Sequence, residues 1–285
     1  MTENEFLLQD RLQKIRSINE QYNLETNAYL SFSGGRDSTI LHHLLDEALP
    51  GNQIPRVYIN TGIEYKLVLN FVRQLQQQDP RIIIYNSGVN IKKMLEEKGY
   101  PFKSKEHAKY VHTFQNSGKT KSVRVYLGEE PGHTCPKFMC PPKLAYQFTQ
   151  DFKIKLSKSC CEELKKKPAA RYQRESGRTI AITGMRTAEG GMRTFITCII
   201  FEENKLKKFH PLAPVPDEWM AWYEREREST VIRALLRALQ FPEDRLQRLP
   251  ICTGPTAGTR HHALPSTGGR KAVRVFMGSG LCGVP

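Results

Sequence analysis

The sequence predicts an α/β protein with a doubly wound, mostly parallel sheet. Short apolar runs alternate with segments of helical period, as expected for strands joined by crossover helices. Strands are expected at about 28–32, 56–60, 81–85 and 179–183, and helices at about 38–45, 67–76 and 91–98. A glycine pair, Gly34-Gly35, follows the first strand directly. Because ligands of such sheets bind at the carboxyl ends of the strands, we expect a binding loop there.

The 285 residues are enough for one large domain with an appendage. We expect a folded domain over 1–228, with a loop-rich insertion at about 99–158 where glycine, proline and lysine interrupt the periodicity. Residues 229–285 are expected to form an irregular basic tail. The polar, acidic N-terminus differs from a signal peptide and no membrane-spanning run is visible, which predicts a cytoplasmic protein without a membrane partner.

The formal net charge of +14 favours a polyanionic partner, nucleic acid included. Its distribution weakens that interpretation, because residues 229–285 hold eight Lys or Arg and only two acidic residues. The seven cysteines, an odd number, suit a reducing compartment and metal ligation better than a disulfide framework.

The segment Ser33-Gly34-Gly35-Arg36-Asp37-Ser38 is predicted to be a phosphate cradle. Adjacent glycines let backbone N–H groups approach an anion without a Cβ in the way. Ser33 and Ser38 add hydroxyl donors, and the helix that continues through Thr39 presents its positive dipole end to the same anion. The alternative is a tight turn capped by Asp37 or Ser38, which does not explain the whole combination.

This loop resembles the SGGxDS pyrophosphate loop that ATP pyrophosphatases share with the phosphoadenosine phosphosulfate (PAPS) reductase family, whose fold is adenine nucleotide alpha hydrolase-like. The resemblance implies that an adenine nucleotide is bound by Ser33, Gly34, Gly35, Ser38 and Thr39. It also implies a catalytic role for Asp37, which would lie close to Mg²⁺ if the nucleotide were ATP.

Two further elements resemble the same family. Thr61-Gly62-Ile63-Glu64 follows the second strand, and the resemblance implies that Thr61, Gly62 and Glu64 lie near the base or ribose; alone, Glu64 would be interpreted as a helix N-terminal acid. Gly184-Met185-Arg186 follows the strand at 179–183, where a glycine suits close backbone approach and Arg186 suits bidentate recognition of phosphate or sulfate. The alternative for Arg186 and for Arg193 is an ion pair with Glu189.

The adjacent pair Cys160-Cys161, followed by lysines and a proline, resembles the cysteine element of sulfonucleotide reductases that carry a [4Fe-4S] cluster. The resemblance implies that these two thiolates bind the cluster and that a later Cys-x-x-Cys completes it. The chain lacks that second pair, so the cluster is expected to be incomplete. Cys135 and Cys140 could instead bind a metal together with this pair, which is a weaker alternative. The purely structural alternative is that Cys160 and Cys161 are two small apolar residues of the core.

The missing pair can be recovered by a change of reading frame. Residues 243–250 can be encoded so that deletion of one base yields Lys-Thr-Gly-Cys-Ser-Gly-Cys-Pro. We therefore favour a frameshift in the tail, which sequencing of the 3′ region of the gene tests. The alternative is a disordered basic tail, which its glycine and proline content also fits.

Three functions follow as expectations. The first is a PAPS reductase family oxidoreductase that acts at the sulfate or α-phosphate of PAPS, APS or ATP, with a thiol reductant protein and a homo-oligomer as possible partners. The second is an ATP pyrophosphatase-like transferase that activates a substrate for sulfur transfer, and the third is a non-catalytic nucleotide or nucleic-acid binder. The chain lacks a convincing C-terminal Glu-Cys-Gly nucleophile, which counts against a complete reductase.

Overall fold

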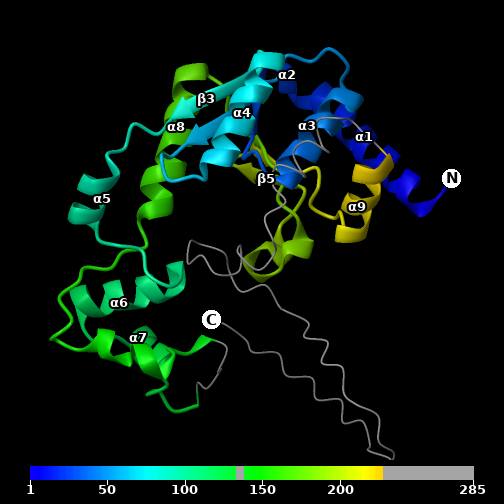
Figure 1. Ribbon diagram of the computed structural model, residues 1–285. Helices are drawn as coiled ribbons and strands as arrows, with labels where there is room; N and C mark the ends of the chain where they lie inside the picture. Colours follow the sequence, from blue (N-terminus) through cyan, green and yellow to red (C-terminus); the bar gives the residue numbers. More distant parts are fainter. Residues whose placement is uncertain (133–137, 227–285) are drawn as a thin grey trace, which may run out of the picture.

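The computed structural model describes residues 1–132 and 138–226, and their centre is a six-stranded sheet with the order β3-β2-β1-β4-β6-β5 (Figure 1). The strands are β1 (Ala28–Ser31), β2 (Arg56–Asn60), β3 (Ile82–Asn86), β4 (Ile180–Ile182), β5 (Ile199–Glu202) and β6 (Lys205–Phe209). All neighbouring strands are parallel except β5 and β6, which pair antiparallel. The predicted doubly wound, mostly parallel sheet is confirmed.

The helices follow the expected order along the chain. They are α1 (Glu3–Tyr22), α2 (Leu24–Asn27), α3 (Arg36–Ala48), α4 (Lys66–Gln78), α5 (Ile91–Lys98), α6 (Lys105–Ser117), α7 (Lys121–Leu127), α8 (Lys167–Ser176) and α9 (Asp217–Glu226). Among the described residues, no helix is long and apolar enough to cross a membrane.

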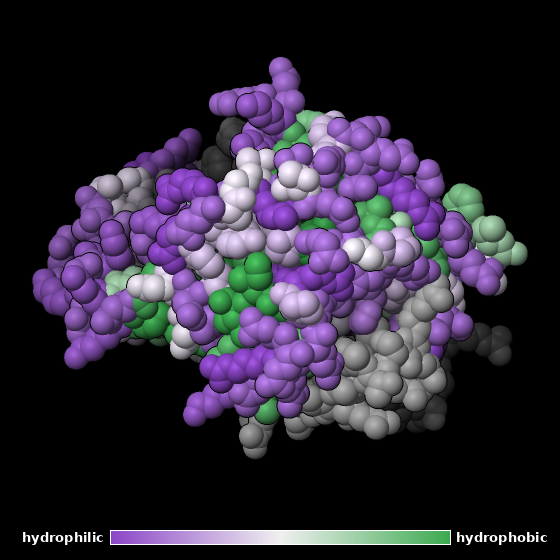
Figure 2. All heavy atoms as spheres, turned by 90° about the horizontal axis from the view of Figure 1, so that it is seen from above, coloured by the Kyte–Doolittle hydropathy of each residue, from purple (hydrophilic) through white to green (hydrophobic). Residues whose placement is uncertain are grey.

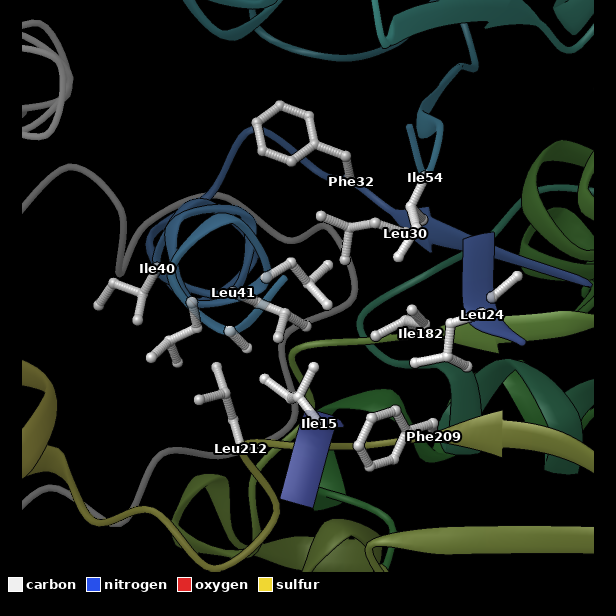
Figure 3. Close-up of a cluster of buried hydrophobic side chains, with 14 of the residues drawn as sticks. Ile15, Leu24, Leu30, Phe32, Ile40, Leu41, Ile54, Ile182, Phe209 and Leu212 are labelled. Carbon is white, nitrogen blue, oxygen red and sulfur yellow. The ribbon is translucent and has the colours of Figure 1, made fainter. Parts of the chain in front are cut away.

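The two faces of the sheet are buried by different helices, which is why its strands are apolar on both sides. On one face, Leu30 and Ile182 pack against Ile40 and Leu41 of α3 and Ile15 of α1 (Figure 3). The other face carries Tyr29, Val57 and Ala181, which pack against Tyr172 of α8. The alternation within β1 and β4 follows from the period of two in a strand.

The binding edge is set by the strand order. After β1 the chain runs to β2 and β3 on one side, then returns to β4 on the other side of β1. The loops that follow β1 and β4 therefore diverge at a topological switch point, where open α/β sheets bind ligands.

The insertion is more regular than expected. Residues 99–158 contain α6, α7 and the 3-10 helix η2 (Pro142–Phe148), and these enclose a small core of their own that includes Val111, Val123 and Phe148. Figure 1 shows α6 and α7 as a lobe set apart from the sheet. The sequence pattern missed this because α6 buries His107, Ala108 and Val111 in place of a stripe of large apolar residues.

The insertion joins the rest of the chain through two adjacent connections. Tyr100 N–H donates to the Lys155 carbonyl at 2.9 Å, and Ser157 N–H donates to the Tyr100 carbonyl at 3.0 Å. Gly99 has φ +100°, and a Cβ there would lie 2.8 Å from the Lys155 carbonyl oxygen, so this approach requires glycine. The insertion thus leaves and re-enters the domain at one point.

Candidate functional site

The loop between β1 and α3 places backbone amides at the switch point. Gly34 has φ +72°, a conformation that favours glycine, and Gly35 is the N-cap residue of α3. No side chain accepts a hydrogen bond at this N-cap, whereas Thr2, Asn23, Asn90 and Ser104 cap other helices in this way. The first-turn amides of α3 therefore lack a capping acceptor, and the turn capped by Asp37 or Ser38 is the wrong interpretation.

The loop hydroxyls hold its shape. The Ser38 hydroxyl donates to the Gly35 carbonyl at 2.9 Å and lies 3.0 Å from the Ser33 hydroxyl, while Ser33 N–H donates to Ser38 Oγ at 3.2 Å. Thr39 is buried, and its hydroxyl donates to the same Gly35 carbonyl at 3.0 Å. Ser38 is buried as well, so Ser33 is the more accessible hydroxyl, and Thr39 holds the loop through its hydrogen bond to the Gly35 carbonyl.

Gly184 lies against the backbone of the loop. A Cβ at Gly184 would stand 3.0 Å from both the carbonyl carbon and oxygen of Asp37, and 3.2 Å from Ser38 N. These distances are shorter than a normal carbon contact, so only glycine lets the end of β4 approach the start of α3. The structure thus brings together two elements that are about 150 residues apart in the sequence.

Arg186 links the loop to α9. Its Nε donates to Asp37 Oδ2 at 3.2 Å and its Nη2 to Asp217 Oδ1 at 2.8 Å, and Nη1 donates to the Val215 carbonyl at 3.2 Å. Burial alone would lower the pKa of Arg186, but the hydrogen bonds and charges of Asp217 and Asp37 raise it above its usual value. The side chain is 6 % exposed, so it holds Asp37 in place and presents little surface to a ligand.

The predicted contact between Arg186 and an anion stays a prediction, since the guanidinium is occupied by two carboxylates here. Arg193 forms an ion pair with Glu189, which was the alternative interpretation of this arginine. The side chain of Arg186 forms no ion pair with Glu189 among the described contacts, and only its backbone N–H donates to that carboxylate, at 3.0 Å.

The turn after β2 is held together by hydrogen bonds to Glu64, a residue of the same turn. Glu64 accepts from the N–H groups of Thr61 and Gly62 at 3.0 and 3.1 Å and from the Thr61 hydroxyl at 2.5 Å. Because β1 and β2 are adjacent and parallel, this turn lies at the same edge of the sheet as the loop. Glu64 occupies the turn amides in this structure, so its predicted contact with a base or ribose stays untested.

Cys160 and Cys161 lie at the start of the helical segment that leads into α8. They are half-buried, and the π-helix η3 (Glu162–Lys166) follows them directly. Short π-helical turns within helices are frequent at functional sites. The thiols of Cys140 and Cys198 are both half-buried, and burial raises the pKa of each.

The described residues do not fit a complete cluster site. Among residues 1–132 and 138–226, no group of three or more His, Cys, Asp or Glu side chains could hold a metal ion, and a [4Fe-4S] cluster ordinarily needs four thiolates. Cys135, Cys252, Cys282 and the tail that carries the frameshift hypothesis lie outside the described residues.

We predict that the 285-residue chain does not retain a stable [4Fe-4S] cluster, because two adjacent thiolates supply only half of its usual ligands. Iron and acid-labile sulfide are measured after anaerobic purification, and both are expected far below four per chain. Stoichiometric iron and sulfide that are lost in Cys160→Ser would contradict this prediction.

Two contacts at the site escaped the sequence interpretation. Arg36 of the loop forms a bidentate ion pair with Glu224 of α9, at 2.7 and 3.0 Å. Arg171 of α8 donates to the carbonyls of Asn86 and Ser87 at the carboxyl end of β3, both at 2.9 Å. No local pattern identifies either arginine, because each partner lies more than 80 residues away.

Together these elements define an α/β protein whose candidate site is a glycine loop at the switch point of a parallel sheet. Residues 27–132 match the phosphoadenosine phosphosulfate reductase domain. This match covers about 37 % of the chain and agrees with the resemblance drawn from the loop.

Among curated proteins, an uncharacterised protein of Methanocaldococcus jannaschii is 29 % identical over 85 residues, which cover 30 % of this chain and 19 % of that protein. The chain thus spans only a small part of this relative's length.

Three solved structures resemble the chain. A PAPS reductase from Candida auris in a phosphate complex is 15 % identical with a TM-score of 0.43, covering 82 % of this chain and 91 % of its own. An NH3-dependent NAD synthetase from Campylobacter jejuni in complex with nitrate is 12 % identical with a TM-score of 0.42, and the match covers 85 % of this chain and 80 % of the synthetase. The U34-tRNA thiolase NcsA from Methanococcus maripaludis with its [4Fe-4S] cluster is 13 % identical with a TM-score of 0.41, and the match covers 81 % of this chain and 71 % of the thiolase.

Proposed function

We propose that the domain over 1–228, with 99–158 inserted, binds an adenine nucleotide at the loop formed by residues 33–38. The observation that carries this proposal is the uncapped N-terminus of α3 behind Gly34 and Gly35, within the residues that match the PAPS reductase domain. The first-turn amides and the positive end of the helix dipole both favour an anion at this place. Ser33 and Ser38 supply hydroxyl donors to the same phosphate or sulfate.

The site residues are assigned as follows. Gly184 keeps the end of β4 against the loop, and Asp37 is the loop carboxylate nearest to the bound anion. Arg186 positions Asp37 through their ion pair, and we propose that one or both side chains contact the reacting group. If the nucleotide is ATP, Mg²⁺ would accompany it, since Mg²⁺ is usually bound through one or two carboxylates and the phosphates.

We propose an enzyme that acts at the sulfate or α-phosphate of this nucleotide. The PAPS reductase domain favours sulfonucleotide reduction, in which a thiol reductant supplies the electrons and sulfite leaves. The second candidate is substrate adenylation with release of pyrophosphate, which the loop alone also supports. Incubation with PAPS and a dithiol, and separately with ATP and Mg²⁺, separates the two by the appearance of sulfite or of pyrophosphate.

Replacement of Ser38 by alanine is expected to weaken nucleotide binding about tenfold or more, because it removes one hydroxyl from the anion and loosens the contact with Ser33. A hydrogen bond to a charged group contributes about 1.5–3 kcal/mol, and a tenfold loss corresponds to about 1.4 kcal/mol. Titration calorimetry with ATP and with PAPS measures the change. Ser122→Ala, which alters an exposed serine of α7, is the matched control.

Equal affinities of Ser38→Ala and the wild type for both nucleotides would contradict the assignment of the loop. Failure of the wild-type protein to bind either nucleotide would contradict the proposed function itself.

A further inference from the structure

The positive charge of the chain is concentrated in two segments. Residues 99–158 contain ten lysines and one arginine against four acidic residues, a surplus of seven. Residues 229–285 hold a surplus of six positive charges. The net charge of the whole chain is +14, so the remaining residues are nearly neutral. Without Lys137, which lies outside the described residues, the insertion still has a surplus of six and is the most basic part of the described chain. Figure 2 shows how widely hydrophilic side chains cover the face seen from above.

Most of these charges are not neutralised within the described part of the chain. The ion pairs of the insertion there join Lys119 to Glu129 and Arg124 to Glu130. Seven further lysines are exposed and have no carboxylate partner among the described residues: Lys103, Lys105, Lys109, Lys121, Lys143, Lys153 and Lys158. Like charges gathered on one small lobe repel each other, and a polyanion relieves that repulsion.

The same lobe exposes large aromatic rings. Four of them are 41 to 62 % exposed: Tyr100, Phe102, Phe138 and Tyr146. Aromatic side chains usually provide most of the burial in a small core, so four exposed rings beside exposed lysines are an unusual surface.

A buried polar pair lies next to two of these rings. The ring of Phe102 lies 6.0 Å from that of His107, whose Nε2 is 2.9 Å from Gln147 Oε1. Gln147 in turn donates to the Tyr146 hydroxyl at 3.2 Å. His107 and Gln147 are 0 and 1 % exposed, so Phe102 and Tyr146 flank one buried hydrogen bond.

Two lysines accompany these rings. Lys103 follows Phe102 with φ +55°, an uncommon conformation for lysine, just before the Ser104 N-cap of α6. The pKa of His107 lies below its usual value because burial lowers it, and the charge of Lys103 acts in the same direction, against the hydrogen bond with Gln147, which raises it. Lys143 precedes Tyr146 by three residues in η2, which is one turn of a 3-10 helix, so the two share a side.

We propose that the surface formed by Phe102, Lys103, Lys143 and Tyr146, here called the lysine-aromatic surface, binds a single-stranded segment of nucleic acid. The lysines contact phosphates, and the rings stack on unpaired bases. Positively charged grooves interleaved with aromatic rings bind single strands in this manner, and duplex bases are not available for stacking. The inference concerns a second ligand and does not depend on the nucleotide assigned to the loop.

The insertion is also connected to the candidate site. Its two connections at Tyr100 and Leu156 lead to α5 and to Cys160, and Arg171 of the same α8 segment donates to the carboxyl end of β3. A strand bound on the lysine-aromatic surface would thus lie on a lobe that joins the domain next to α5 and Cys160.

The test uses the full chain and a fluorescein-labelled 20-nucleotide single strand of mixed sequence, as RNA and as DNA, with anisotropy read over a range of salt concentrations. The double variant K103Q/K143Q is expected to reduce the slope of log K against log salt by about 1.4, because each phosphate contact on a single strand contributes about 0.7. The control K205Q/K208Q removes two exposed lysines of β6 and is expected to leave the slope unchanged.

The aromatic contribution is tested separately. The double variant F102L/Y146L is expected to weaken single-strand binding tenfold or more at constant salt slope, because it removes stacking without removing charge. Photo-crosslinking of a thiouridine-substituted strand is expected to label peptides from residues 99–158. This readout on the wild-type protein does not depend on the folding of any variant.

Four results would overturn the proposal. They are absence of single-strand binding at low salt, equal slopes for K103Q/K143Q and the wild type, crosslinks confined to 229–285, and a preference for duplex over single strand of the same length.

Discussion

Replacement of Arg186 by alanine is expected to lower the free energy of unfolding by about 2–3 kcal/mol. The change removes hydrogen bonds to Asp37, Asp217 and the Val215 carbonyl, and leaves the Asp37 carboxylate without its cationic partner. Breaking a fully buried pair costs about 3–5 kcal/mol and an exposed one less than about 1. Asp37 and Asp217 are 25 and 63 % exposed, so the expected value lies between these limits. Urea unfolding followed by circular dichroism measures the effect.

The matched control is Arg193→Ala. Arg193 also pairs with a glutamate, but its side chain is 49 % exposed, so a loss below about 0.5 kcal/mol is expected. Equal costs for the two variants would mean that Arg186 does not hold the loop to α9.

Arg186→Lys adds a second readout. Lysine keeps the charge but cannot donate to both carboxylates in the planar fork of a guanidinium. If Arg186 only positions Asp37, nucleotide affinity is expected to fall less than tenfold in Arg186→Lys. A loss of 100-fold or more, with folding retained, would indicate direct contact between Arg186 and the anion.

Replacement of Gly184 by valine is expected to reduce nucleotide affinity at least 100-fold. The new Cβ would stand 3.0 Å from the Asp37 carbonyl group, and the two added methyl groups would need still more room. The neighbouring atoms belong to the backbone of the first turn of α3, so the turn must shift, and the amides proposed to bind the anion shift with it. Overpacking of this kind also costs about 1–3 kcal/mol of stability.

Gly177→Ala is the control for a general loss of stability. Gly177 caps the far end of α8 at φ +71° with no atom within 4 Å of an added Cβ, so alanine introduces backbone strain there without a clash. It is expected to lower stability by about 1 kcal/mol and to leave nucleotide affinity unchanged. Normal binding by Gly184→Val would exclude the close contact between β4 and α3 as part of the site.

Much of the fold was predictable because its signals are local. Apolar runs of four or five residues identified β1 to β4, and helical periodicity identified α3, α4 and α5. The loop at 33–38 was predictable because glycine conformation and the amides of a helix N-terminus are properties of neighbouring residues. The antiparallel pairing of β5 with β6 was not predicted, since pairing depends on which segments meet.

The site itself was predictable only in part. The sequence indicated Gly184 for close approach and located it at the end of a strand, and the structure supplies the contact with Asp37. The sequence pattern suggested an anion for Arg186, but the structure gives that side chain two carboxylates, one of them from α9. A favourable ion pair depends on distances between segments far apart in the chain, which no local pattern encodes.

The glycine loop thus shows the division between the two kinds of information. Its backbone conformation and its hydroxyl groups follow from six consecutive residues, and the helix behind it follows from the periodicity of residues 38–45. Its surroundings were decided by the tertiary structure alone. Gly184 packs against the loop backbone, Arg186 donates to the Asp37 carboxylate, and Arg36 pairs with Glu224. The insertion follows the same division, because its lysines are visible in the sequence, whereas only folding places Phe102 and Tyr146 around one buried hydrogen bond.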